Sequence, residues 1–211
     1  MLRVILSLVL GGVTCLSAAH AAVVSTSGTA VFTGSPFPPE QDGTIFVFDE
    51  QQNVAFDTDQ VLDFGAIADG TLVNSHYIQF DPASATGQVG EGSIVFDGPI
   101  LGVITSTANL NANLGGTTSD FYFGLSATLG AYPTGADASA RGIGSPDDDL
   151  QIVLGSNTLI IESLEIPTGA NGNIDGIRVL TAANPIPVPA ALWPMLTAIG
   201  GLVALRRKQR G

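Results

Sequence analysis

Few residue types in the body of this chain could carry out chemistry, and histidine is the first of them. The 211 residues include two histidines, His20 near the N-terminus and His76 in the body. A Ser-His-Asp triad would have to use His76. Its neighbour Ser75 lies directly before it, at the start of a predicted strand, where adjacent side chains point to opposite faces. We therefore predict no catalytic residue, and we expect His76 at a strand edge, hydrogen-bonded to a loop.

The body of the chain, residues 22–183, contains neither cysteine nor lysine, which excludes chemistry by either residue there. Cys15 is the only cysteine and lies in the N-terminal apolar segment. The body therefore has neither a disulfide nor a zinc site of the usual His and Cys composition. Residues 22–183 contain no lysine and no GxxxxGK pattern, which excludes a phosphate-binding loop of that type.

Carboxylates are the remaining candidates. Asp147, Asp148 and Asp149 form the densest acidic run. Three consecutive carboxylates repel one another unless they are solvated or bound to a cation, and calcium prefers oxygen ligands of this kind. Two interpretations stay open here: a calcium site, or solvated acids of a loop. A glycosidase would need two facing carboxylates, but no pattern marks such a pair, and we expect no enzyme.

The distribution of charge limits the partners. All 19 acidic residues lie between Glu40 and Asp175, where the only basic residues are Arg141 and Arg178. With 19 acids and two arginines, the body has a net charge of −17. Nucleic acid is excluded as a partner, because phosphate binding needs clustered Lys and Arg on the folded body. Such a body repels anionic surfaces unless divalent cations bridge the two.

The first 21 residues are typical of a secretory signal peptide. Arg3 supplies the positive start, Val4–Val13 is an apolar run, and Ala19-His20-Ala21 fits the small-x-small pattern of a cleavage site. We predict cleavage after Ala21, with cleavage after Ala19 as the alternative. An uncleaved anchor is the other interpretation, although the apolar run is short for a membrane span.

Residues 184–211 form a C-terminal segment with a proline-rich stretch, an apolar stretch and a basic end. From Ile186 to Leu205, 20 residues carry no charge, which is about 30 Å of helix and enough to cross a bilayer. Trp193 suits the headgroup interface, and the basic end is expected to stay cytoplasmic. The basic residues are Arg206, Arg207, Lys208 and Arg210. Together with the signal peptide, this order places the body outside the cytoplasm.

The body, residues 22–183, has the pattern of one all-β domain. Its apolar residues come in short runs bounded by Gly, Pro, Asn and Asp. In one of these runs Ile45 and Val47 would face one side of a strand, and Phe46 and Phe48 the other. Such a strand is expected to be covered on both sides. We predict an antiparallel β-sandwich, with a jelly roll as one option.

The predicted strands are spread over the whole body. They are Thr29–Thr33, Thr44–Asp49, His76–Asp81, Gly92–Phe96, Ile100–Thr105, Phe121–Leu125, Leu150–Leu154, Thr158–Ile161 and Ile174–Thr181. Thr168–Asn173 is expected to be a loop between the last two strands, and Gln60–Ile67 a turn of helix at most. Helices are expected only in the signal peptide and in the C-terminal span.

The tail resembles a known class of sorting signal. Its residues Ile186, Pro187, Val188, Pro189 and Ala190, then the apolar stretch and the basic end, resemble the PEP-CTERM signals of Gram-negative bacteria in their VPLPA-CTERM variant. Ile186 stands for the usual Val and Val188 for the usual Leu. The resemblance implies recognition by an exosortase, a membrane-embedded cysteine peptidase, after insertion in the inner membrane with the body in the periplasm. A plain membrane anchor that is never processed is the alternative.

Segments of the body are also similar to proteins of that class. These are Asn74–Pro82, Ile100–Thr105 and Asp175–Thr181, and no catalytic residues accompany them. The resemblance implies an exported surface or matrix protein, associated with exopolysaccharide and reaching the cell surface or the medium after tail processing. A lectin-like carbohydrate-binding module, with or without calcium, is the alternative function, and a carboxylate-based hydrolase is a third.

Overall fold

The computed structural model describes most of the body of the chain. The described residues are 23–33, 41–83, 87–111, 113–114, 117–118, 122–124, 142–143, 147–166 and 174–183. The predicted signal peptide, the C-terminal segment and the predicted loop Thr168–Asn173 lie outside them. The body, Ala21–Asn184, forms a unit separate from the two terminal segments. Among the described residues, no helix is long and apolar enough to cross a membrane.

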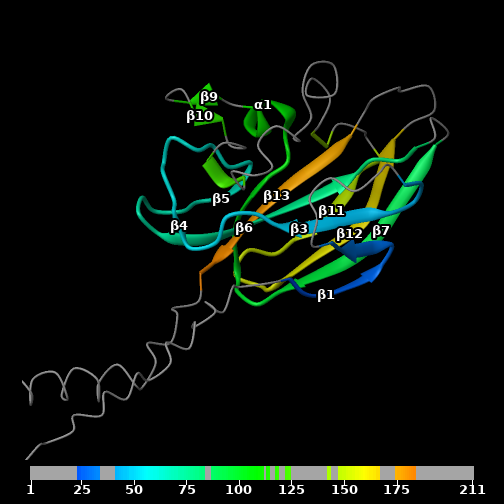
Figure 1. Ribbon diagram of the computed structural model, residues 1–211, viewed down its shortest axis with the longest axis horizontal. Helices are drawn as coiled ribbons and strands as arrows, with labels where there is room; N and C mark the ends of the chain where they lie inside the picture. The colour runs from blue at the N-terminus through cyan, green and yellow to red at the C-terminus, as the bar shows by residue number, and fades with distance from the viewer. Residues whose placement is uncertain are drawn as a thin grey trace, which may run out of the picture. The chain divides into compact units, whose positions relative to one another are not determined.

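The smaller sheet has four antiparallel strands, in the order β1-β7-β12-β11. Their bounds are β1 Val23–Gly28, β7 Gln88–Phe96, β12 Thr158–Ile166 and β11 Asp149–Ile152. Strands β7 and β12 pair along nearly their whole length, with a change of register between Ile161 and Leu164. β1 and β11 are therefore the two edges of this sheet (Figure 1).

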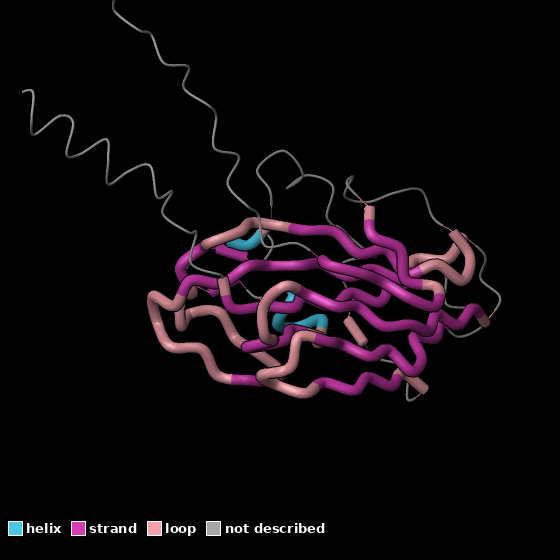
Figure 2. The backbone as a smooth tube through the Cα atoms, turned by 90° about the horizontal axis from the view of Figure 1, so that it is seen from below, coloured by secondary structure: helices cyan, strands magenta, loops and turns pink. Residues whose placement is uncertain are grey.

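The larger sheet has seven strands, with the order β2-β3-β6-β13-β8-β5 and β4 beside β6. Their bounds are β2 Ala30–Phe32, β3 Ile45–Asp49, β4 Val54–Ala55, β5 Phe64–Gly65, β6 Leu72–Phe80, β8 Ile100–Ile104 and β13 Asp175–Ala182. The long strands β6 and β13 pair without interruption from Val73 with Ala182 to Phe80 with Asp175. They form the centre of the sheet, and Figure 2 shows most strands lying roughly alongside one another.

The two sheets face each other across one hydrophobic core. The larger sheet contributes Ile45, Val47, Ile78, Phe80, Ile100, Val103, Ile177 and Val179, and the smaller sheet Val23, Ile94, Phe96, Leu159, Ile161, Leu164 and Ile166. Nearly all of these side chains are fully buried. Burial of a large aliphatic or aromatic side chain stabilises a fold by about 1.5–3 kcal/mol, so this shared core is what holds the sheets together.

A second cluster covers the outer face of the larger sheet. It consists of Phe48, Phe56, Ile67, Val73, Tyr77, Ile104, Leu110, Phe123 and Leu180. Leu110 belongs to the short helix α1 (Thr107–Leu110), whose first turn is capped by the Ser106 hydroxyl. The larger sheet is therefore apolar on both faces, as the alternation of Ile45 and Val47 with Phe46 and Phe48 predicted.

The chain passes from one sheet to the other at a glycine. Gly28 ends β1 with a φ of 70°, which side chains disfavour. A Cβ atom placed there would lie 2.5 Å from the Glu91 carbonyl oxygen. Thr29 then donates its backbone N–H to that carbonyl, and Ala30 begins β2 in the other sheet. Only glycine allows both the turn and the close approach.

The prediction of an all-β fold is confirmed, but the larger sheet is mixed. β2 and β3 run parallel, pairing Ala30 with Ile45 and Phe32 with Val47, whereas the other strand pairs in the described residues are antiparallel. Parallel neighbours need a long connection, and residues 33–44 supply it. The prediction of a purely antiparallel sandwich therefore fails at this edge.

One strand prediction is wrong, and a short strand lies where at most a turn of helix was expected. The sequence pattern predicts a strand at Phe121–Leu125, but Tyr122 and Phe123 are helical, because Phe123 turns inward to pack over the larger sheet. Gln60–Ile67 contains no helix and includes β5, whose Phe64 pairs with Val103 of β8. The sequence pattern also misses α1, β1 and the short strands β4, β9 (Asn113–Leu114) and β10 (Thr117–Thr118).

Candidate functional site

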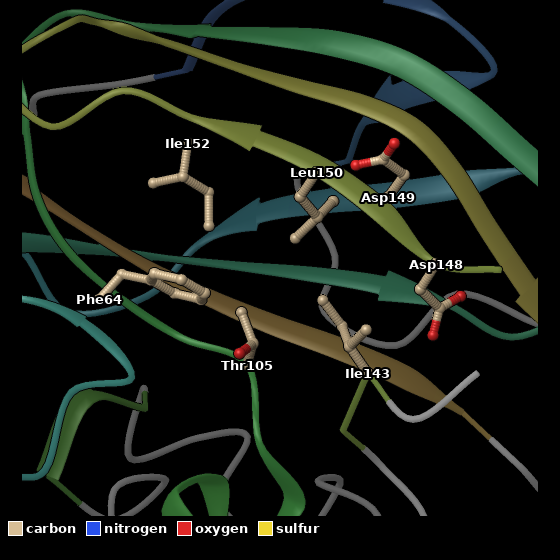
Figure 3. A pocket seen from close by; sticks show the side chains of 7 residues that line it. All are labelled: Phe64, Thr105, Ile143, Asp148, Asp149, Leu150 and Ile152. Carbon is tan, nitrogen blue, oxygen red and sulfur yellow. The ribbon is translucent and has the colours of Figure 1, made fainter. Parts of the chain in front are cut away.

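The predicted acidic run lies at the start of edge strand β11. The Asp148 Oδ1 atom accepts the backbone N–H of Glu165 at 2.8 Å, and the Asp147 carbonyl accepts a hydrogen bond from the Ser163 hydroxyl. Asp149 is the first residue of β11 and is exposed. Figure 3 shows the carboxylates of Asp148 and Asp149 pointing in different directions. The run is therefore attached to β12 rather than gathered around one point.

A pocket opens beside this run, where the edge of the smaller sheet faces the edge of the larger one. Its volume is about 340 Å³, at the lower end of the range of roughly 300–1,000 Å³ for small-molecule sites. Its lining is mostly apolar with two carboxylates and one hydroxyl: Phe64, Thr105, Ile143, Asp148, Asp149, Leu150 and Ile152 (Figure 3). Phe64 is half exposed, and its ring forms part of the wall.

A third carboxyl, that of Asp175, is buried, and the negative charge of Asp148 acts on it. It begins β13, directly opposite Phe80 of β6, and is only 5% exposed. Its Oδ2 atom has no hydrogen-bond partner. Burial, and then the negative charge of Asp148, raise the pKa of Asp175 to about 8. Both effects disfavour the charged form, so Asp175 is mostly protonated at pH 7. No local pattern indicates this, since Asp175 lies 26 residues after Asp149 in a separate strand.

The calcium prediction at Asp147, Asp148 and Asp149 stays a prediction. Among the residues that the structure describes, no three His, Cys, Asp or Glu side chains are grouped to hold a metal ion. Calcium usually takes six to eight oxygen ligands, so backbone carbonyls or water would have to supply most of them at this run.

His76 lies in a central strand and not at an edge, which corrects the sequence-based expectation. Its Nδ1 atom lies 2.6 Å from the Asp49 Oδ1 atom, and its Nε2 atom 3.1 Å from the Thr181 hydroxyl. Carboxylate, imidazole and hydroxyl thus follow the order of a catalytic triad. However, His76 and Thr181 are completely buried, and the imidazole packs on Phe96. A substrate cannot reach the Thr181 hydroxyl. The hydrogen bonds from Asp49 through His76 to Thr181 instead link strands β3, β6 and β13.

Ser75 points to the other face of β6, as predicted. Its hydroxyl donates to the Glu50 Oε2 atom at 2.6 Å. The same carboxylate accepts two hydrogen bonds from Arg178, Nε to Oε2 and Nη2 to Oε1, both at 2.7 Å. The arginine and glutamate side chains are fully buried. Ser75 is therefore a further hydrogen-bond donor to a buried ion pair and takes no part in a triad with His76.

Aromatic rings enclose this ion pair. The Arg178 guanidinium lies 5.2 Å from the Tyr77 ring centroid and 5.6 Å from that of Phe123. Such cation–π contacts add stability when the cation is desolvated. Gln51 ties the Phe123 segment to the same place, because its backbone N–H donates to the Phe123 carbonyl and its side chain to the Gly124 carbonyl. The group is structural, and it fixes residues 122–124 over the larger sheet.

Asp63 organises the connection after β8. Its carboxylate accepts the backbone N–H groups of Thr105 at 2.6 Å and Ser106 at 2.7 Å, the Ser106 hydroxyl, and the Asn109 amide at 2.6 Å. Burial alone would raise the pKa of Asp63, but the hydrogen bonds from Ser106, Thr105 and Asn109 outweigh burial and lower it. Asp63 thereby holds the start of α1 next to the Thr105 wall of the pocket.

No protein-family model, no curated protein and no solved structure matches this chain.

The predicted sorting and cleavage residues lie outside the described part of the chain. They are Ala19 and Ala21, the motif Ile186, Pro187, Val188, Pro189 and Ala190, and the basic residues Arg206, Arg207, Lys208 and Arg210. They remain predictions from the sequence.

Proposed function

We propose that the chain is a non-catalytic, exported surface or extracellular-matrix protein that carries a C-terminal sorting signal. The observation that carries the proposal is the tail itself. A proline motif, an uncharged stretch from Ile186 to Leu205 and a basic end occur in that order after the body. With the N-terminal signal peptide, the tail holds the body in the periplasm until an exosortase processes it. The protein then reaches the cell surface or the medium, in association with exopolysaccharide.

The body is proposed to be a β-sandwich related to the jelly roll. Two facing sheets with one shared core support this assignment. The non-catalytic role is supported by the arrangement at His76, where the hydroxyl in contact with the imidazole, that of Thr181, is completely buried. A nucleophile must reach its substrate. The Thr181 hydroxyl could do so only if the central strands of the larger sheet separated.

Removal of residues 185–211 tests the proposal. The full chain and the shortened chain, both with the signal peptide, are expressed in a Gram-negative host that has an exosortase, and cells are separated into membranes, periplasm and medium. The full chain is expected first in the inner membrane and then at the surface or in the medium, and the shortened chain only in the periplasm. The same distribution for both chains would mean that the tail is not a sorting signal.

Carbohydrate binding is the second candidate, and the pocket favours it. Phe64 offers a half-exposed ring, and Asp148 and Asp149 offer oxygen acceptors at the other end. An aromatic ring can pack on the C–H face of a sugar, and carboxylate oxygens can accept hydrogen bonds from its hydroxyls. Glycan-array binding that is lost in Phe64→Ala, and retained in the matched surface variant Leu72→Ala, would support this function. No binding to any glycan by the parent protein would exclude it.

A further inference from the structure

We propose that the edge strand β1 pairs in antiparallel fashion with β1 of a second copy of this chain, so that the two smaller sheets join into one. This inference goes beyond the proposed function, because it concerns an interaction surface of the body and is independent of the tail. It is also separate from the pocket, which lies beside β11 at the opposite edge of the smaller sheet.

The first support is the open side of β1. In the described part of the chain β1 pairs with β7 and with no other strand, and it forms one edge of the smaller sheet (Figure 1). An edge strand presents a row of backbone N–H and C=O groups with which another strand can pair. The pairing with β7 is continuous from Ser25 to Gly28, after a bulge at the start of the strand. Ser25–Gly28 therefore has the geometry that a further strand needs.

The second support is the lack of charge along this edge. Residues 23–32, which form β1, the turn after it and β2, contain neither a charged residue nor a proline, although the body has a net charge of −17. The stretch of β7 that pairs with β1, Gly92–Phe96, is uncharged as well. Val24, Val31 and Phe32 are exposed on residues 23–32. Charged side chains and proline are common protections of an edge strand against pairing, and this edge lacks both.

The other described edges of the two sheets differ from β1. Strand β11 begins at Asp149, directly after Asp147 and Asp148, so its start is acidic. Strand β5 has two residues and β2 has three, and such short edges offer few groups for pairing. With six residues, β1 is therefore the longest described edge strand and has no charge of its own.

The distribution of charge favours a second copy as the partner. A basic partner would be attracted by the carboxylates, which all lie between Glu40 and Asp175, and not by β1. Two copies of the body repel each other where carboxylates meet, whereas two β1 strands bring no charges of their own together. A two-fold axis between the copies makes this pair antiparallel, like the other pairs of the smaller sheet. Hydroxyl side chains of Ser25, Thr26 and Ser27 then lie opposite one another, which is a favourable cross-strand pairing.

The dimer is expected to be weak and to depend on salt. One pair of short strands is a small contact, typical of transient association. The repulsion between the two acidic bodies opposes it and is screened by salt, because the Debye length falls from about 30 Å at 0.01 M to about 8 Å at 0.15 M ionic strength. The fraction of dimer is therefore expected to rise with sodium chloride.

Disulfide trapping in the full chain tests the pairing. The chain carries Cys15→Ser, so that each introduced cysteine is the only one present. Ser25→Cys, Thr26→Cys and Ser27→Cys are oxidised separately in mild detergent, after circular dichroism has shown which of them keep the parent fold. Opposed residues of antiparallel strands have Cα atoms about 4.5–5.5 Å apart, which is within the range for a disulfide. A covalent dimer is expected from at least one of the three variants, with a higher yield at 0.15 M than at 0.01 M sodium chloride.

Val153→Cys is the matched control, because Val153 directly follows β11 at the opposite edge of the smaller sheet. Val153 is 60% exposed, close to the 63% of Val24. This variant is expected to give no covalent dimer. Val24→Glu, added to the cysteine variant of highest yield, is expected to reduce the yield several-fold, since a charge on an edge strand opposes pairing. Val153→Glu in the same background is expected to leave the yield unchanged.

Three results would overturn the proposal. No covalent dimer from any folded variant with a cysteine in β1 would mean that β1 does not meet its counterpart. Equal yields from β1 and from Val153→Cys would mean that the copies collide at random or associate through another part of the chain. Equal effects of Val24→Glu and Val153→Glu would show that the added charge acts on the whole body and not on the β1 edge.

Discussion

Arg178 on β13 forms a two-point ion pair with Glu50, the residue that follows β3, across the intervening strand β6. The two hydrogen bonds are both 2.7 Å long, and neither side chain is exposed. Ser75 of β6 adds a third hydrogen bond to the same carboxylate. The pair therefore links three adjacent strands of the larger sheet on its outer face, beneath Phe123.

Removal of Arg178 is predicted to destabilise the body strongly. Arg178→Met leaves the Glu50 carboxylate buried without its counter-charge, and breaking a buried pair in this way costs about 3–5 kcal/mol. The measurement is the free energy of unfolding from urea denaturation at pH 7. The double variant Arg178→Met with Glu50→Gln is predicted to recover part of the loss, because no buried charge remains. A single variant as stable as the parent protein would contradict a buried, paired Glu50.

The stability of the body is predicted to fall as pH rises from about 4 to about 8. The unfolded chain releases the Asp175 proton near the ordinary pKa of 3.8, whereas the folded protein keeps it until about pH 8. Between these values the folded state binds more protons, so this group lowers the free energy of unfolding by about 1.4 kcal/mol per pH unit. Urea unfolding in EDTA at several pH values measures the slope.

Asp175→Asn is predicted to remove that slope and to be more stable than the parent protein at pH 8. The amide has the same shape as the acid and does not ionise. Asp57→Asn, at an acid with no comparable burial, serves as the control and is predicted to leave the slope unchanged. An identical pH profile for Asp175→Asn and the parent protein would show that Asp175 ionises normally.

Asp63 is predicted to act in the opposite direction. Its pKa is lowered in the folded protein, so its contribution is present above the unfolded pKa of 3.8 and is lost as pH falls through the lower folded pKa. Asp63→Ala leaves the N–H groups of Thr105 and Ser106 without their acceptor. The expected cost is about 1–3 kcal/mol at pH 7. The same loss at pH 2 as at pH 7 would contradict a charge-dependent role.

Much of the fold follows from the pattern of apolar residues. Ile45 and Val47 point into the shared core while Phe48 packs on the outer face, as the double alternation predicted. Adjacent Ser75 and His76 point to opposite faces for the same reason. These features depend on neighbours along one strand, and the two-residue period of a strand determines them.

The candidate site depends instead on contacts between distant strands. Asp148 directly precedes β11 and Asp175 begins β13, a strand of the other sheet, so no local pattern relates the two carboxyls. The burial of Arg178 depends on Glu50, 128 residues away, and on Phe123, which local pattern places in a strand. At Phe123 long-range packing overrode the local strand pattern.

Export followed by tail processing is tested most directly by the intact mass of the protein recovered from the surface and medium of an exosortase-bearing host. We predict a mass that lacks residues 1–21, or 1–19 with the alternative cleavage, and also lacks the basic end Arg206–Gly211. The same host without its exosortase should yield, in the membrane fraction, a chain that retains Arg206–Gly211. A surface or secreted protein with its basic end intact would contradict processing, and one with residues 1–21 intact would contradict signal-peptide cleavage.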